Sequence, residues 1–158
     1  MDFGISGKTA FVAASTGGLG LAIARALAAE GVRVAITGRR EVRAKEIVAE
    51  LTDAYGPGAI AVEADLSTAE GVAAAVEQTV AELGPIDILV LNGPGPKPGA
   101  AATLGVDDIA AAFEQLVKPH HALVSHILPG MRERRWGRIL AVGSSGVVAP
   151  LPNLAVSN

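Results

Sequence analysis

The chain has 158 residues, of which 50% are hydrophobic, and a formal net charge of -3; this predicts one domain over residues 1–158 and argues against a nucleic-acid partner. No cysteine is present, which excludes disulfides and thiol chemistry and fits the reducing cytoplasm. The start does not resemble a signal peptide, and no apolar run reaches the roughly 18 residues that span a membrane, so neither export nor a membrane partner is expected.

Apolar runs alternate with amphipathic helical patterns along the chain. Strands are expected at 9–13, 32–37, 59–62, 86–91 and 138–142, and helices at 19–30, 42–54, 68–83 and 106–134. Strands that are separated by helices form a parallel sheet through right-handed crossovers, with helices on both faces. The pattern therefore predicts an α/β fold, a doubly wound parallel sheet in three α/β/α layers. The stretch 93–99, rich in glycine and proline, is expected to be a loop within this domain.

The turn after the first strand has the most specific pattern, Ala14-Ser15-Thr16-Gly17-Gly18-Leu19-Gly20. Small residues let the backbone approach a pyrophosphate, and the amides at the start of the next helix bind its charge. A position between a buried strand and a helix is the context that a dinucleotide-binding motif requires. The alternative is a tight structural turn that binds nothing.

This turn resembles the phosphate loop of the short-chain dehydrogenase/reductase family, T-G-x-x-x-G-x-G. Gly18 and Gly20 match its last two glycines, while Ala13 and Ala14 replace its first Thr and Gly. Asp65-Leu66 is similar to the segment that the family places beside the adenine. The stretch 87–93 is similar to the family's D-I-L-V-N-N-A-G, with Leu91 in place of the first Asn. The stretch 137–145 resembles the strand that precedes the family's catalytic serine.

The resemblance implies a Rossmann-like sheet of order 3-2-1-4-5, truncated relative to the family, and a nicotinamide dinucleotide as cofactor. It also implies a small carbonyl or acyl substrate and a homo-oligomer. The residues that it implies for cofactor binding are Ala14, Ser15, Thr16, Gly18, Leu19, Gly20, Arg39, Arg40, Asp65, Leu66, Asn92 and Gly93.

The end of the second strand indicates which dinucleotide binds. An acidic residue there would accept hydrogen bonds from the ribose of NAD, whereas Arg39 and Arg40 offer guanidinium groups suited to the 2'-phosphate of NADP. We therefore favour NADP. Alternatively, Arg39 or Arg40 begins a solvated helix face beside Glu41.

The catalytic residues that the resemblance implies are incomplete. Ser144 fits the serine that donates a hydrogen bond to the substrate, but the family's Y-x-x-x-K pattern aligns with Leu154 and Asn158, which can neither donate the proton nor supply the positive charge. Leu116 stands near the position of a further family Asn. The single tyrosine, Tyr55, is expected at the end of the second helix, away from the substrate.

Another group could supply the proton. Lys118, His120 and His121 surround Pro119 near the position of the missing Asn, and imidazoles titrate near neutral pH. Adjacent histidines on a helix point in different directions, so at most one faces the site. The alternative is a surface or packing role for all three. No metal site is expected, because the histidines lack zinc-like spacing.

Family members continue beyond the position of Asn158 with a further helix and strands. Without them, the strand around Ile139 would be an uncovered apolar edge. Either the sequence is a piece of a longer chain, which we favour because such a patch promotes aggregation, or another subunit covers this surface.

Two functional hypotheses remain. The first is an NADP(H)-dependent short-chain oxidoreductase that reduces a carbonyl substrate of the 3-oxoacyl type by hydride transfer. The second is a non-catalytic dinucleotide-binding protein or fragment that has lost the Tyr/Lys active site. The phosphate-loop pattern, Asp65 and Ser144 fit both, whereas Leu154 and Asn158 favour the second, so catalytic activity stays open.

Overall fold

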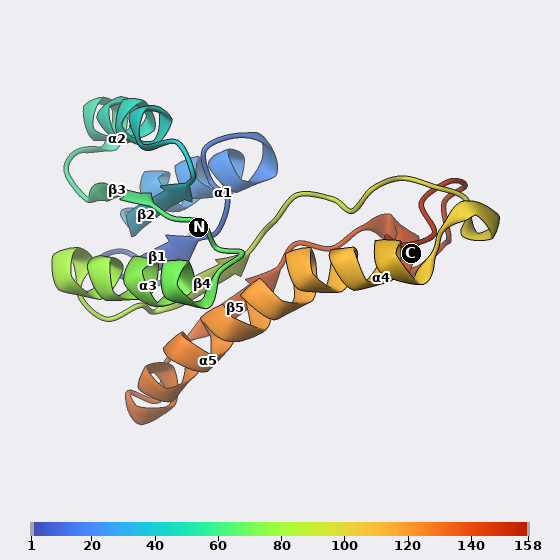
Figure 1. The fold of residues 1–158 in the computed structure, drawn as a ribbon. Helices are drawn as coiled ribbons and strands as arrows, with labels where there is room; N and C mark the ends of the chain where they lie inside the picture. Colours follow the sequence, from blue (N-terminus) through green and yellow to red (C-terminus); the bar gives the residue numbers. More distant parts are fainter. Residues whose placement is uncertain (1, 158) are drawn as a thin grey trace.

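The computed structural model describes residues 2–157 and contains one five-stranded parallel sheet (Figure 1). Its strand order, β3-β2-β1-β4-β5, confirms the predicted order. The chain crosses from β3 at one edge back past β1 to β4, so the direction of winding reverses between β1 and β4. The strands are β1 (Thr9–Val12), β2 (Arg33–Gly38), β3 (Ala59–Glu63), β4 (Ile88–Leu91) and β5 (Arg138–Ala141).

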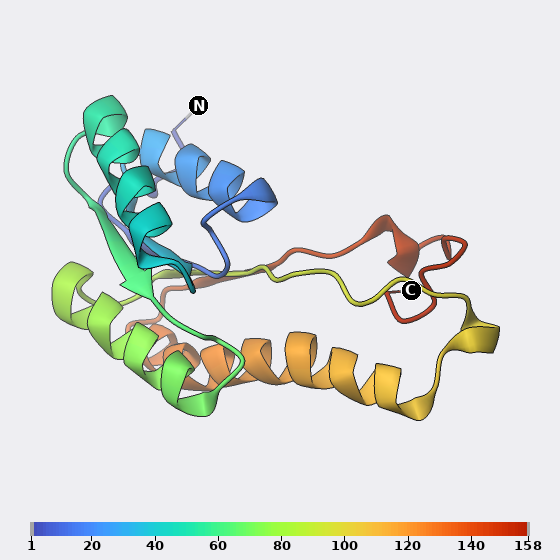
Figure 2. The ribbon, with the colours of Figure 1, turned by 45° about the horizontal axis from the view of Figure 1, so that its top comes forward.

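Helices cover both faces of this sheet, which confirms the three layers (Figures 1 and 2). Two helices pack on each face: α1 (Gly18–Ala29) and α2 (Glu41–Tyr55) on one, α3 (Ala69–Leu83) and α5 (Lys118–Glu133) on the other. Side chains of β1 alternate between the two layers. Ala10 and Val12 join the core under α1 and α2, whereas Phe11 joins the core under α3 and α5. This alternation explains why β1 is buried at every position.

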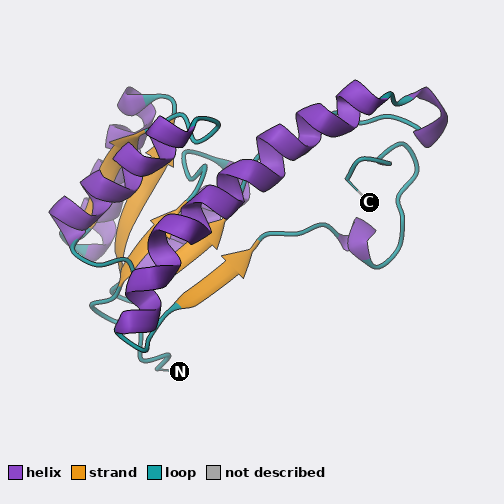
Figure 3. Ribbon diagram, turned by 60° about the horizontal axis from the view of Figure 1, so that its bottom comes forward, coloured by secondary structure: helices purple, strands orange, loops and turns teal. Residues whose placement is uncertain are grey.

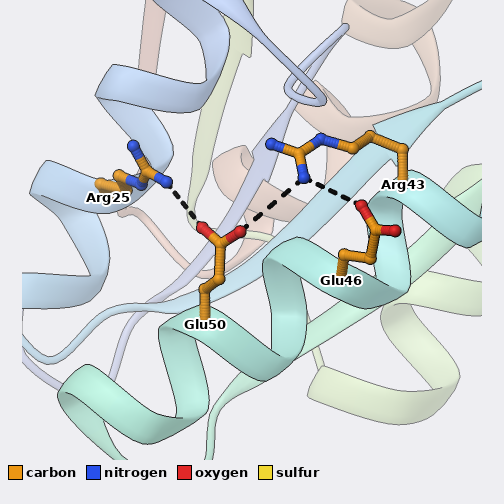
Figure 4. A network of polar contacts seen from close by, with 4 residues as sticks. All are labelled: Arg25, Arg43, Glu46 and Glu50. Atoms are coloured by element: carbon orange, nitrogen blue, oxygen red, sulfur yellow. Dashed lines mark hydrogen bonds and ion pairs between the residues drawn. The ribbon is translucent and has the colours of Figure 1, made fainter.

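One exposed ion pair connects α1 to α2, and Arg43 adds two more within α2 (Figure 4). Glu50 Oε2 accepts a hydrogen bond from Arg25 Nη2 at 2.7 Å, and Arg43 Nη1 lies 2.9 Å from Glu46 Oε2 and 3.7 Å from Glu50 Oε1. The two glutamates thus lie on the solvent side of α2. Exposed pairs of this kind contribute about 0–1 kcal/mol each, so the buried layers hold the two helices in place.

The predicted helix over 106–134 is interrupted. The structure has α4 (Val106–Ala112), then a π-helical segment (Phe113–Val117), then α5. The π turn closes through a bond from Lys118 N–H to the Phe113 carbonyl. Pro119 explains the interruption, because proline has no N–H to donate to the carbonyl four residues earlier. In Figure 3 the combined helix projects beyond the sheet.

The edge strand β5 is exposed along its whole length, with Ile139 39% and Leu140 51% exposed. The expectation of an uncovered apolar edge is thus confirmed for this strand. After β5 the chain runs out beside the loop that follows β4, and Leu154 forms an isolated parallel bridge with Gly99 (Figure 2). Within residues 2–157, no helix combines the length and apolar character needed to cross a membrane.

Candidate dinucleotide site

A cavity of about 530 Å³ lies where the carboxyl ends of β1 to β4 meet the start of α1 and the middle of the long helix. In doubly wound sheets, ligands bind at this end, where the strand order reverses. The lining residues are Ala14, Thr16, Gly17, Gly18, Leu19, Gly38, Arg39, Ala64, Asp65, Leu66, Ser67, Asn92, Gly93, Pro94, Gln115, Pro119, His120 and Leu123.

The start of α1 presents free backbone amides to this cavity. The residue before the helix, Gly17, supplies no side-chain cap, whereas Thr68 caps α3 by accepting a hydrogen bond from Gly71 N–H at 3.0 Å. The first N–H groups of an α-helix have no partner within the helix. At α1 they are free to bind an anion, which the helix dipole also favours. Gly18 has a φ of +54°, a conformation that favours glycine.

Two residues of the predicted phosphate loop, Ser15 and Gly20, support the loop without lining the cavity. Ser15 is fully buried, and its Oγ donates to the Val12 carbonyl at 2.7 Å and accepts from Thr37 N–H at 2.8 Å. A Cβ at Gly20 would lie 2.5 Å from the Ala14 oxygen and 2.7 Å from Asn92 Nδ2, so only glycine fits there. The structure therefore places Ser15 and Gly20 behind the cavity wall.

Asn92 connects β4 to the loop. Its Nδ2 donates to the carbonyl oxygens of Ala13 and Ala14, both at 3.2 Å. Ala14 itself has a φ of +49°, in the region where the family's glycine would be unstrained. Asn92 thus fixes the turn at Ala13 and Ala14, although Ala14 lies 78 residues earlier in the sequence. The Asn92 side chain also lines the cavity.

One end of the cavity carries opposite charges. Arg39 follows β2 and Asp65 follows β3, and both line the wall, as does Leu66. Ser67 lowers the pKa of Asp65 below its ordinary value, because its Oγ and then its N–H donate to the carboxylate; the positive charge of Arg39 lowers it further. Asp65 is therefore a carboxylate at neutral pH. Arg40 precedes α2, is exposed and lies outside the lining.

The opposite end is formed by the loop after β4 and the long helix. Asn92, Gly93 and Pro94 face Gln115 and His120 there. Ring atoms of His120 lie close to Gly93: a Cβ built on that glycine would be 3.5 Å from Nε2. Sequence reasoning missed Gln115. Pro119 was the available signal, because a proline in a helix releases the carbonyl of residue 115 and widens that turn.

The structure does not bring the predicted catalytic positions to this cavity. Ser144 is exposed after β5, and its Oγ accepts a hydrogen bond from Gly146 N–H at 3.1 Å, which caps the short helix Ser145–Val147. Leu154 is half-buried and bridged to Gly99. Tyr55 is half-exposed at the end of α2, as predicted. Asn158 lies outside the described residues.

The remaining polar candidates lie on the outer surface of the long helix. Lys118 pairs with Glu114 at 2.7 Å, and His121 is exposed outside the lining. In residues 2–157, no group of three or more acidic, histidine or cysteine side chains is arranged to hold a metal ion. His120 is thus the one member of the predicted Lys/His cluster that reaches the cavity.

Comparison with solved structures shows the same fold. L-sorbose reductase from Gluconobacter frateurii, solved with NADPH and L-sorbose, superposes with a TM-score of 0.92 at 34% identity over 100% of this chain and 60% of its own. A 3-ketoacyl-(acyl-carrier-protein) reductase from Brucella melitensis, solved with NADH, gives 0.86 at 30% identity over 97% and 63%.

Sequence comparison agrees with these structures. A short chain dehydrogenase of Pseudocercospora fijiensis is 37% identical over 153 residues, which cover 94% of this chain but 48% of that protein. The chain thus spans about half the length of this relative. The family model of short chain dehydrogenases matches residues 8–156. Because this match covers nearly the whole chain and agrees with the sheet order and the cavity, the protein belongs to the short chain dehydrogenase family.

Proposed function

We propose that this chain binds NADP(H) and takes part in the reduction of a small carbonyl substrate, of the 3-oxoacyl type. The observation that carries the proposal is the uncapped start of α1, which opens into a cavity of about 530 Å³ with an arginine and a carboxylate at one end. The family's cofactors are nicotinamide dinucleotides, and the chemistry that they supply is hydride transfer.

The described residues fit a dinucleotide along the length of this cavity. Free amides at Gly18 and Leu19 suit the pyrophosphate. Arg39 and Asp65, beyond β2 and β3, suit the adenosine half. The nicotinamide half would then extend toward the loop after β4, where Asn92 and His120 line the wall. No cysteine or metal is needed for this binding mode.

Arg39 supports NADP over NAD. It lines the cavity directly after β2, where a 2'-phosphate would accept two hydrogen bonds from its guanidinium group. Arg40 follows in sequence but lies outside the lining, so we assign it no contact with the cofactor. Among the structural relatives, L-sorbose reductase was solved with NADPH and the Brucella reductase with NADH, so family membership alone does not decide between them.

Fluorescence titration of the purified chain with NADPH and NADH tests this choice. NADPH is expected to bind more tightly. Arg39→Ala should weaken NADPH binding by roughly 10-fold or more, because charged hydrogen bonds contribute about 1.5–3 kcal/mol. NADH binding should change little. Arg40→Ala is the matched control and should leave both affinities unchanged. Equal losses for the two variants would remove the assignment of Arg39.

The phosphate loop needs its own test. Gly18→Val should abolish binding of both dinucleotides, because a β-branched residue is strained at a φ of +54° and would stand at the cavity wall. Gly84→Val is the control, since Gly84 also has a positive φ (+82°) and open space around its Cβ but lies outside the cavity lining. Unchanged NADPH affinity in Gly18→Val would contradict the site. If the unmodified chain binds neither dinucleotide, the proposed function is wrong.

A further inference from the structure

The charged end of the cavity holds a cation and an anion that are neighbours but are not paired. Arg39 and Asp65 follow adjacent strands, and both line the cavity. Gly38 is the partner of Glu63 in the ladder of β2 and β3, and Ala64 N–H donates to the Gly38 carbonyl at 3.0 Å. Within residues 2–157, Arg39 nevertheless forms neither a hydrogen bond nor an ion pair, so its guanidinium group is free to bind a ligand.

The Asp65 carboxylate is bonded to Ser67 instead. Its Oδ1 accepts hydrogen bonds from Ser67 Oγ at 2.7 Å and from Ser67 N–H at 3.0 Å. These two bonds lower the pKa of Asp65 most, and the positive charge of Arg39 lowers it further. The charge of Arg39 therefore reaches the carboxylate, but the hydrogen bonds that hold the carboxylate come from Ser67.

The backbone of Asp65 is held separately from its side chain. The Asp65 carbonyl oxygen accepts hydrogen bonds from Thr68 N–H at 3.3 Å and from Thr68 Oγ1 at 3.2 Å. A Cβ at Gly71 would clash with the same oxygen, so the first turn of α3 approaches it closely because residue 71 is glycine. Loss of the Ser67 hydroxyl would therefore free the carboxylate without releasing the turn that carries it.

We propose that Ser67 is a positioning residue for the choice of dinucleotide: its hydroxyl keeps the Asp65 carboxylate away from Arg39, which leaves the guanidinium group available to the 2'-phosphate of NADP(H). This inference rests on the proposed function and deepens it. A carboxylate paired with Arg39 would occupy the donors that a phosphate needs. NADPH would then have to displace the carboxylate before it could bind, whereas NADH has no 2'-phosphate and would not.

Ser67→Ala tests this role, because it removes the hydroxyl and keeps the N–H of residue 67. NADPH affinity should fall roughly 2- to 5-fold, the range expected when an exposed ion pair must first be broken. NADH affinity should stay the same, so the ratio of the two affinities is the quantity to measure, at low ionic strength where exposed charges are least screened. Ser67→Thr retains a hydroxyl and should keep the ratio of the unmodified chain.

Thr68→Ala is the matched control. It perturbs the same turn, because Thr68 Oγ1 donates to the Asp65 carbonyl and caps α3, but it leaves both bonds to the carboxylate. Thr68 also lies outside the cavity lining. A general disturbance of the turn would change the affinities for NADPH and NADH together, so Thr68→Ala should leave their ratio unchanged.

The adenosine end can also be probed alone. In calorimetric titrations with 2',5'-ADP and with 5'-AMP, Ser67→Ala should weaken only the ligand that carries the 2'-phosphate. Asp65→Asn removes the charge that could pair with Arg39, so in that background Ser67→Ala should no longer change the ratio of affinities. This double-mutant cycle separates an effect through Asp65 from direct contact between Ser67 and the ligand.

Urea denaturation of each variant first establishes that it is folded. The role of Ser67 is overturned if Ser67→Ala weakens NADPH and NADH equally, if it changes neither, or if its effect persists in the Asp65→Asn background. In each of these cases the unmodified chain still binds NADPH, and the proposed function stands. If the unmodified chain binds neither dinucleotide, the proposed function is wrong, and the role of Ser67 is wrong with it.

Discussion

Replacing Ala14 with glycine should remove a local strain from the nucleotide loop. Ala14 has a φ of +49°, and it is the loop's one non-glycine residue with positive φ in the described chain. A side chain in this left-handed region costs about 1–2 kcal/mol, which glycine avoids. The neighbouring Ala13 has no positive φ and is fully buried, so Ala13→Gly is the matched control.

The two variants are expected to change the free energy of unfolding by different amounts. Each loses about 0.4–1 kcal/mol because glycine adds freedom to the unfolded chain. Ala13→Gly also loses a buried methyl group, worth about 0.8 kcal/mol, whereas Ala14 is half-buried and loses about half as much. Relief of strain occurs in Ala14→Gly alone. Ala14→Gly should therefore be neutral or slightly stabilising, and about 2 kcal/mol more stable than Ala13→Gly.

Urea denaturation of the unmodified chain and both variants measures this difference directly. A gap of about 2 kcal/mol corresponds to roughly 4–8 °C in Tm for a chain of this size. Ala14→Gly should also retain the hydrogen bonds from Asn92, which go to backbone oxygens. If Ala14→Gly is as destabilising as Ala13→Gly, the left-handed conformation of residue 14 carries no strain and the reasoning fails.

Two further predictions concern stability. Thr68→Ala should lower the free energy of unfolding by about 1 kcal/mol in urea titration, because it removes the cap on Gly71 N–H, whereas Thr68→Ser should keep it; equal losses in both variants would contradict the cap. A hydrogen bond from Gly105 N–H, and then the hydrogen bond and charge of Lys97, lower the pKa of Asp108. Asp108 therefore adds to the free energy of unfolding above its unfolded-state pKa, and this contribution is lost as pH falls below about 4. The urea midpoints of Asp108→Asn and the unmodified chain should therefore differ at pH 7, and the gap should narrow as pH falls from about 4 through the lowered pKa of Asp108; a constant gap would refute this contact.

The sheet was predictable because its strands follow a simple rule. A strand that is buried on both faces is recognised by an apolar run, as formed by Ala10, Phe11 and Val12, and helices between such strands predict a parallel sheet. The positions of Arg39, Asp65 and Asn92 after β2, β3 and β4 then followed, because parallel strands end at one edge.

Side-chain direction in irregular segments was not predictable. Ser15 belongs to the loop pattern, yet its hydroxyl turns inward to Val12 and Thr37, because buried backbone groups there need partners. The wide turn before α5 depends on Pro119. It could not be recognised from the apolar periodicity of 106–134, which predicts one continuous helix. The role of Gln115 in the lining could therefore not be read from spacing alone.

The bond between Asn92 and the nucleotide loop has a consequence for synthesis of the chain. Ala14 leaves the ribosome 78 residues before Asn92, a delay of about 4–16 seconds at 5–20 residues per second. During that interval the central strand β1 also lacks β4, its partner on one side. A nascent chain can therefore form the loop early but cannot fix it, and a polypeptide that ends before residue 92 would leave the Ala13 and Ala14 carbonyls without this donor.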